Sequence, residues 1–407
     1  MWRKLGQNRA VRDHTTEELG TLGDIRDDTR EGFRTIYGKD PHGLWSAPGV
    51  MRLIGDHTEY ADGHTLCLAL DVRTVVALGV RNDRTIRVAS VDQDEIAEIS
   101  LDDLDGETLE GWPKYPLGTA WALGQFGADL HAVPGVDLYI DSDVPTQVRL
   151  GSSVALSVAV ALALRDAWQV DADATQLARV CNMAESLAAG EDVGLGPILA
   201  SLTGQADHGV LVDGRSKDFD NVPLGFASSE HTLLHIQTHA EPSTLPPLAD
   251  RLKAIEQVAD ALGVPSLREA SASTISASDE LEEFPAADRA LAVHTVRENA
   301  RVLEVVRALR EEGPLSVGQL FADSHQSLAE AFGPHSLDIN LAVDIAQENG
   351  ASAARLLGHR SSSSVVAIVP HSDVSRITQA LDTGFSEHGL AAPDVSVFNP
   401  SDHATRH

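Results

Sequence analysis

The sequence has few cysteines, few basic residues relative to acidic ones, and no long apolar run. Two cysteines in 407 residues provide neither a disulfide framework nor a zinc-binding pattern. Lys and Arg number 31 against 61 Asp and Glu, so the formal net charge is -30. This balance argues against the basic surface that nucleic-acid binding requires. The longest apolar run, 154–164, is interrupted by Ser157 and stopped by Arg165, well short of the roughly 18 residues of a membrane span.

The remaining composition is typical of a soluble globular protein. Hydrophobic residues make up 43% of the chain, and its length suits two to three average domains. The first residues, MWRKLGQNRAVRDH, are polar and charged and lack the apolar segment of a secretory signal. We therefore expect a cytoplasmic protein with neither a membrane nor a nucleic-acid partner.

The order of the predicted elements indicates an α+β fold in two domains. A polar turn region at 214–223 marks the predicted boundary, which gives domains 1–222 and 223–407. The closing β-α-β pattern suits an antiparallel sheet with helices on one face. Helices are predicted at 12–38, 116–127, 151–168, 174–189, 246–264, 285–312, 315–332, 336–349 and 373–389, and strands within 65–101 and at 136–145, 210–213, 232–239, 365–370 and 395–400.

Several common sites are absent or weak. The only Gly-Lys pair, Gly38-Lys39, is followed by Asp40, which excludes a P-loop of the Walker type. No GxSxG elbow of a serine hydrolase is present. The evenly spaced histidines in 231–239 fall in a strand-like segment, so we expect ordinary strand and turn histidines there and no metal site.

One short stretch concentrates polar side chains on a glycine-rich backbone. In SAPGVMRLIGDHTEYADGH (46–64), Asp56, His57, Glu59 and Tyr60 form a cluster typical of a site for a hydroxyl-rich ligand. Before the cluster, Val50 stands where a site that handles phosphate would place a cation. A second stretch, 144–164, is a loop that enters a helix, whose free N–H groups attract phosphate.

Together with 181–216 and 350–370, these stretches resemble the galactokinases, a family of GHMP small-molecule kinases. Further counterparts are GLWSAPG (43–49), WPKYPLG (112–118), GQADHGVLVDGRS (204–216) and the ending VFNPSDHATR. The resemblance implies a two-lobed GHMP kinase fold in which ATP and a sugar, galactose or a relative, meet in a cleft between the lobes.

The resemblance fails at the residues that carry the family's chemistry. The arginine beside the reacting phosphate falls on Val50, and the Asp that acts on the sugar hydroxyl falls on Pro197. Proline has no titratable group and cannot act as a general base, although it fits the first turn of a helix. The family's sugar-binding Glu and Asp become Asp56 and Glu59, which keeps both charges but changes the length of each side chain. His57, Tyr60 and Gly194 are retained, while a sugar-contacting tyrosine falls on Leu248.

The motifs that bind the nucleotide in the family also differ in this sequence. Two phosphate-loop glycines become Gln147 and Arg149, ahead of Gly151, Ser152 and Ser153, and we expect these side chains to crowd the loop. The later glycine loop becomes LGHRSSS (357–363) and contains Arg360. Glu185 aligns with a magnesium-linked carboxylate and pairs with Ser152 as the implied metal site. ATP and Mg²⁺ are therefore the expected cofactors if nucleotide binding is retained, and otherwise none.

Three hypotheses follow. The first is a galactokinase-like protein with impaired or absent phosphoryl transfer, kept as a sugar- or nucleotide-responsive binding protein, with a protein partner if its role is regulatory. The alternative is an active sugar kinase with a rearranged site, in which Arg52 or Arg149 supplies the missing cation. The third is a structural or interaction protein that binds neither ligand.

Overall fold

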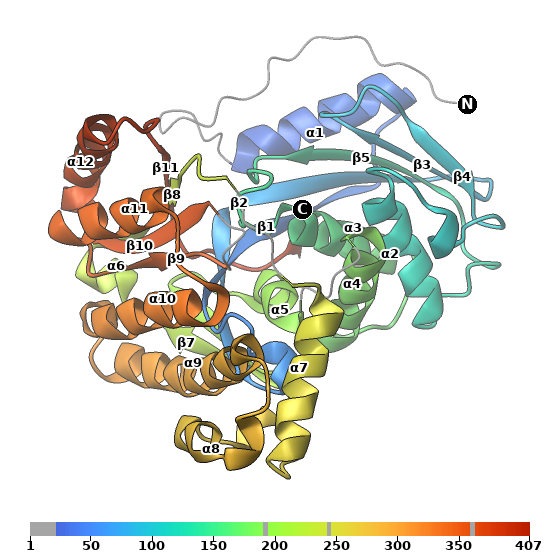
Figure 1. Ribbon diagram of the computed structural model, residues 1–407. Coiled ribbons are helices and arrows are strands. Elements are labelled where there is room, and N and C mark those ends of the chain that lie inside the picture. Colours follow the sequence, from blue (N-terminus) through green and yellow to red (C-terminus); the bar gives the residue numbers. More distant parts are fainter. Residues whose placement is uncertain (1–21, 190–193, 242–245, 359–362) are drawn as a thin grey trace. The chain divides into compact units, whose positions relative to one another are not determined.

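The computed structural model describes residues 22–189, 194–241, 246–358 and 363–407 (Figure 1). The chain divides into two compact units, each assembled from separate segments. Unit 1 comprises 1–50, 69–204 and 401–407, and unit 2 comprises 51–68 and 205–400. The boundary predicted at 222/223 lies inside unit 2, because the long segment of that unit begins at 205.

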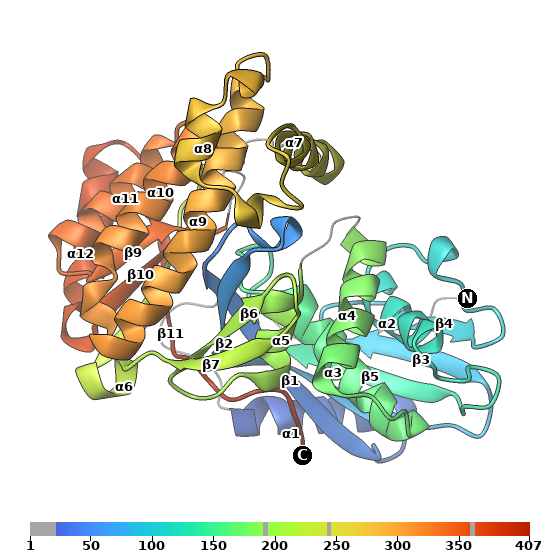
Figure 2. The same cartoon turned by 90° about the horizontal axis from the view of Figure 1, so that it is seen from below.

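Unit 1 is a mixed sheet with helices on both faces. In strand order the main path of the sheet is β12-β1-β2-β5-β3-β4, with β3 parallel to β5 and β2 antiparallel to β5. The start of β2, which belongs to unit 2, also pairs with β6 (His208–Asp213), and β6 pairs with β7 (Phe219–Pro223). Figure 2 shows α1 on one face and α2, α3 and α4 on the other. The strands are β1 (Gly43–Ile54), β2 (His64–Val80), β3 (Thr85–Ser90), β4 (Ala97–Ser100), β5 (Val136–Ser142) and β12 (Thr405–Arg406), and the helices are α1 (Leu22–Tyr37), α2 (Lys114–Gln125), α3 (Ser152–Trp168), α4 (Ala174–Ala189) and α5 (Leu195–Thr203).

The long apolar run of the sequence is the middle of α3. Every position from Val158 to Leu164 is buried, as expected of a helix that is apolar all round and packs in a core. In the described part of the chain, no helix is both long and apolar enough to cross a membrane. Both cysteines, Cys67 and Cys181, are free thiols and buried. Burial raises the pKa of Cys67 to about 12.

Unit 2 contains the expected antiparallel sheet. Its strand order is β11-β8-β10-β9, and the central pair aligns Leu234 with Ala367. Apolar side chains of these strands pack with those of α10, α11 and α12 in one cluster that includes Leu328, Ile339 and Phe385. Figure 1 shows the three helices beside the sheet. The elements are β8 (His231–Gln237), β9 (Ala353–Leu356), β10 (Ser364–Pro370), β11 (Asp394–Phe398), α10 (Gly318–Phe332), α11 (Leu337–Glu348) and α12 (Val374–Glu387).

A long helix, α9 (Ala286–Glu311), connects this sheet region to a second cluster in unit 2. There Ala61, Val258 and Leu291 pack together from three separate elements. The remaining elements are α6 (Phe226–Ser229), α7 (Leu248–Ala261), α8 (Ala272–Ala277), β6 (His208–Asp213), β7 (Phe219–Pro223) and the 3-10 helices η1 (Glu59–Ala61), η2 (Gly106–Thr108), η3 (Leu267–Glu269), η4 (Asp279–Leu281), η5 (Pro314–Ser316) and η6 (His371–Asp373).

Four strands, β1, β7, β9 and β12, were not predicted from the sequence, and β7 and β9 show why. Residues 214–223 were predicted as a turn region, but 219–223 form β7, which pairs with β6 through the backbone and exposes Phe219 and Asp220. Its side chains therefore lack the apolar alternation of a half-buried strand. The strand β9 reads AARL, which has little β-propensity, and it forms because it pairs with β10. The histidines His231 and His235 are buried in β8, and the described residues contain no three-residue metal-binding group.

Candidate functional site

The loop that enters α3 adopts a backbone conformation that favours glycine. The φ angle is +64° at Gln147, +65° at Arg149 and +65° at Gly151. Only Gly151 adopts this left-handed conformation without a steric cost. The loop therefore bends as a glycine-rich phosphate loop can, although two of the three positions carry side chains.

Val50 packs directly against the start of α3. It is buried in β1, and its N–H donates to the carbonyl oxygen of Leu150 at 2.9 Å. A Cβ atom placed on Gly151 would lie 2.2 Å from Cγ2 of Val50. The valine thus occupies the space that any side chain at 151 would need, and it offers no charge to a phosphate.

Glu185 lies beside the same helix. Ser157, on the second turn of α3, donates its hydroxyl to Oε1 of Glu185 at 2.6 Å, and the carboxylate is fully buried. Burial raises the pKa of Glu185. Its second oxygen, Oε2, is buried without a hydrogen-bond partner among the described residues.

These donors fit a magnesium ion accompanied by phosphate. Mg²⁺ commonly binds one or two carboxylates and completes its shell with phosphate oxygens and water. The orphaned Oε2 of Glu185 supplies a carboxylate oxygen, and Ser152 and Ser153 place hydroxyls in the first turn of α3. The pair Glu185 and Ser152, which the resemblance implied as the metal site, stays a prediction.

Pro197 lies in the first turn of α5, as the sequence analysis expected. The helix begins at Leu195 after Gly194, whose φ is +78°, so the proline replaces no helical hydrogen bond there. One turn later, Ser201 donates to the carbonyl oxygen of Pro48 at 3.1 Å, which ties α5 to β1 two residues before Val50. Val50 in β1 and Pro197 at the start of α5 thus both carry apolar side chains.

In unit 2, the cluster Asp56, His57 and Glu59 lies on one loop after β1. Asp56 is buried and forms an ion pair with Arg355, whose side chain is fully buried in β9. Arg355 also donates to the carbonyl oxygen of Leu53 at 3.0 Å. A carboxylate has two oxygens with about four lone-pair positions, so this ion pair leaves acceptors available.

A second carboxylate completes the buried network around Arg355. Glu298 on α9 accepts hydrogen bonds from the N–H of Gly55 at 3.2 Å and from Ser324 at 2.8 Å, and it pairs with Arg301. Its Oε1 also lies 3.9 Å from Nη1 of Arg355. The loop that carries Asp56 is therefore fixed by charges in the core of unit 2.

His57 is held in an unusual conformation. Its φ is +65°, and its ring packs 4.4 Å from the ring of Phe332. Nδ1 lies 2.9 Å from the hydroxyl of Tyr60 and 3.1 Å from Nη1 of Arg251. Because a guanidinium can only donate, Nδ1 is an acceptor, so the neutral ring carries its proton on Nε2. Burial raises the pKa of Tyr60 to about 12, so its hydroxyl stays protonated.

Glu59 binds Arg52 at 2.6 Å. This pair commits one of the two arginines that the alternative hypothesis used as a replacement cation. Arg149 has an interaction partner as well, and Arg360 lies outside the described residues.

Each side chain of the cluster therefore has its own arginine. Sequence reasoning missed Arg251 and Arg355, which come from α7 and β9. Leu248 begins the helix that carries Arg251. No local pattern marks either arginine.

Comparison with solved structures defines the class of protein. The chain superposes on a crystal structure of Lactococcus lactis galactokinase complexed with galactose, with a TM-score of 0.84, 22% identity and coverage of 94% of this chain and 99% of that chain. It also superposes on Methanococcus jannaschii mevalonate kinase, with a TM-score of 0.62, 13% identity and coverage of 89% and 99%. The model of the GHMP kinases N terminal domain matches residues 114–205. The fold is that of the GHMP kinases.

Sequence comparison narrows the class to one family. The Galactokinase galactose-binding signature matches residues 31–80. The chain is 34% identical over 389 residues to a galactokinase of Streptomyces coelicolor, covering 95% of this chain and 98% of the relative. It is 31% identical to a galactokinase of Roseiflexus sp., covering 92% and 95%. The chain belongs to the galactokinase family.

Proposed function

We propose that this member of the galactokinase family binds galactose or a related sugar and transfers phosphate from ATP slowly or not at all. The observation that carries the proposal is the pair Val50 and Pro197, which places apolar groups where the family has an arginine and a general base. Losing a general base typically lowers a rate by about 10²–10⁴-fold. Losing a charge beside the transferring phosphate removes electrostatic stabilisation in addition.

Sugar binding is supported by the loop that carries Asp56, His57 and Glu59. These side chains lie within the matched galactose-binding signature, and the Lactococcus lactis relative was solved with galactose. Their arginine partners hold the carboxylates and the imidazole in place, which preorganises polar groups for hydroxyls. Gly194 completes the proposed set of sugar-binding residues.

Nucleotide binding is supported by the start of α3. Gly151, Ser152 and Ser153 offer N–H groups and hydroxyls at a helix N-terminus, where phosphate is favoured. Glu185 and Ser152 would hold Mg²⁺, which neutralises charge on the phosphates when bound. We include ATP and Mg²⁺ among the proposed ligands.

The same residues favour a second candidate, an active sugar kinase. Phosphoryl transfer depends mainly on positioning and electrostatics, so a kinase does not strictly require a base. The phosphate loop keeps its left-handed turns, and Glu185 keeps an available oxygen. This candidate needs a cation other than Arg52, which is already bound to Glu59.

The deciding experiment measures binding and turnover separately. Calorimetry with galactose and with ATP–Mg²⁺ is combined with an assay of galactose 1-phosphate formation. We expect galactose binding and turnover at least about 100-fold below the ordinary kinase range of roughly 1–100 s⁻¹. Pro197→Asp should raise turnover because it restores a carboxylate at a helix position that tolerates one.

Other outcomes identify the rival hypotheses. Turnover in the ordinary range would establish the active kinase and refute our proposal. Absence of binding to both ligands would favour a structural or interaction protein. A regulatory role with a protein partner stays a prediction, to be pursued once sugar binding is measured.

A further inference from the structure

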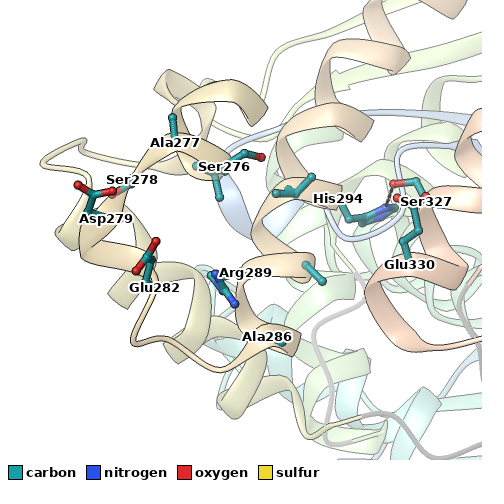
Figure 3. Close-up of a pocket in the computed structure, with 13 residues that line it drawn as sticks. Ser276, Ala277, Ser278, Asp279, Glu282, Ala286, Arg289, His294, Ser327 and Glu330 are labelled. Carbon is teal, nitrogen blue, oxygen red and sulfur yellow. Dashed lines mark hydrogen bonds between the residues drawn. The ribbon is translucent and has the colours of Figure 1, made fainter.

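A pocket of about 550 Å³ lies within unit 2, between α8, η4, α9 and α10 (Figure 3). Its size is in the range of small-molecule sites. None of the residues proposed to bind sugar, nucleotide or magnesium lines it. The pocket is therefore available to a different ligand.

Arg289 is the one cationic side chain lining this pocket. It lies in the first turn of α9 and is half-buried. Its Nε is buried without a hydrogen-bond partner, and no described residue pairs with its guanidinium. A buried donor without an acceptor costs free energy, which a carboxylate ligand would recover.

The rim of the pocket carries the opposite charge. Three carboxylates line the pocket: Asp279 and Glu282, in and after η4, are exposed and have no side-chain partner among the described residues, whereas Glu330 on α10 accepts from Gln326 at 3.0 Å. Figure 3 shows Arg289 between the carboxylates of Asp279 and Glu282 and the pair His294–Ser327. Ile275, with Ala290 and Val293 of α9, provides an apolar wall.

The charge pattern selects among ligand classes. A simple anion would satisfy Arg289 but meet repulsion from the rim carboxylates. A simple cation would satisfy the rim and leave Arg289 without an acceptor. A small zwitterion satisfies both ends, and an apolar side chain suits the wall.

We propose that this pocket binds a small zwitterion of the amino-acid or dipeptide class, with its carboxylate on Arg289 and its ammonium group on Asp279 and Glu282. The site is a second, regulatory ligand site in unit 2. Its link to the proposed sugar cluster passes through one histidine that lines the pocket.

His294 connects the pocket to the backbone of Asp56. Its Nε2 lies 3.1 Å from the carbonyl oxygen of Asp56, and its Nδ1 lies 2.8 Å from Oγ of Ser327. A carbonyl only accepts, so Nε2 carries the proton and Nδ1 accepts from the Ser327 hydroxyl. Burial lowers the pKa of His294, which keeps the ring neutral.

A ligand carboxylate that reaches Ser327 would compete with His294 for the hydroxyl hydrogen. Loss of that bond would loosen the ring that holds the Asp56 carbonyl. Ligand binding should therefore change the affinity for galactose, a consequence that rests on the proposed sugar-binding role of Asp56.

Calorimetry without sugar or nucleotide tests the site itself. The probes are L-leucine and glycyl-L-leucine, with N-acetyl-L-leucine and L-leucinamide as analogues that each lack one charge. We expect the zwitterions to bind and each analogue to bind at least about tenfold more weakly. Arg289→Gln should weaken the zwitterions by at least about tenfold as well.

Arg307→Gln is the matched control. Arg307 is exposed on the same helix, 18 residues or about 27 Å further along, and has no partner among the described residues. Its substitution should leave binding unchanged. If Arg289→Gln fails to fold, the exposed double variant Asp279→Asn/Glu282→Gln tests the ammonium end and should reduce binding.

Three results would overturn the proposal. One is the absence of binding by both zwitterions at millimolar concentration. Another is equal binding of N-acetyl-L-leucine or inorganic phosphate, which would indicate a plain anion site. The third is binding that survives both the Arg289 and the rim variants. Unchanged galactose affinity in saturating glycyl-L-leucine would refute only the coupling, provided that galactose binds.

Discussion

Replacing Gly151 by alanine should destabilise unit 1 through a specific collision with Val50. The added Cβ would lie 2.2 Å from Cγ2 of Val50, whereas carbon atoms pack at about 3.5–4.0 Å. The residue would also adopt a φ of +65°, which disfavours side chains. Both effects act in the folded state only.

Each effect has its own expected cost in unfolding free energy. Overpacking in a tight site costs about 1–3 kcal/mol, and the left-handed conformation costs about 1–2 kcal/mol. Gly151→Ala should therefore cost about 2–5 kcal/mol in the wild-type background. Val50→Ala alone should cost about 2 kcal/mol, from two lost methyl groups and a small cavity.

In the Val50→Ala background, the colliding Cγ2 atom is absent. Gly151→Ala should then cost mainly the backbone contribution of about 1–2 kcal/mol. The double-mutant cycle should give a favourable coupling of about 1–3 kcal/mol. Denaturant unfolding of the four proteins, followed at a unit 1 probe such as Trp45, measures it.

Gly38→Ala provides the matched control. Gly38 has a similar φ of +69° in the same unit, and nothing lies within 4 Å of an added Cβ. It should show the backbone cost alone, with no coupling to Val50. Additivity of Val50→Ala and Gly151→Ala within about 0.5 kcal/mol would refute the collision.

Three further predictions concern buried groups. Arg355→Met should lower the unfolding free energy by about 3–5 kcal/mol because it leaves Asp56 as an unpaired buried charge. The control Arg376→Gln, at an exposed ion pair, should cost below about 1 kcal/mol. Equal losses in the two variants would contradict this prediction. Burial raises the pKa of Glu185, so the folded state loses stability as pH rises above the ordinary pKa of 4.5. Glu185→Gln should therefore flatten the profile of Tm against pH in this range, and it should weaken ATP–Mg²⁺ binding. An unchanged profile would count against the assignment. Cys67 and Cys181 should react with a thiol reagent only on unfolding, because both are buried and burial raises their pKa values; rapid labelling of the native protein would disagree.

Much of the secondary structure could be predicted from the sequence because long elements have a strong pattern. The apolar run in α3 and the amphipathic pattern of α7 are local signals, and both helices lie where they were predicted. The strands β7 and β9 have no such pattern and form by backbone pairing to β6 and β10. Their hydrogen bonds depend on the partner strand, which no local window contains.

The candidate site was predictable in part for the same reason. The cluster at 56–60 is contiguous, so its polar side chains are visible in the sequence. Their partners are distant in the sequence: Arg251 lies 194 residues after His57, and Arg355 lies 299 residues after Asp56. Only the folded unit brings these charges together.

The loop 147–151 keeps a left-handed backbone at two positions where the resemblance expects glycine. The substitutions predicted a crowded loop, yet Gln147 and Arg149 keep positive φ angles of +64° and +65°. The bond from Val50 to Leu150 and the start of α3 hold the segment at one end, and this anchoring offsets a strain of about 1–2 kcal/mol per residue. Glycine loss therefore removes conformational freedom but not the conformation itself. Reduced phosphoryl transfer would then follow chiefly from the missing charge at Val50 and the missing carboxylate at Pro197, and less from a collapsed loop.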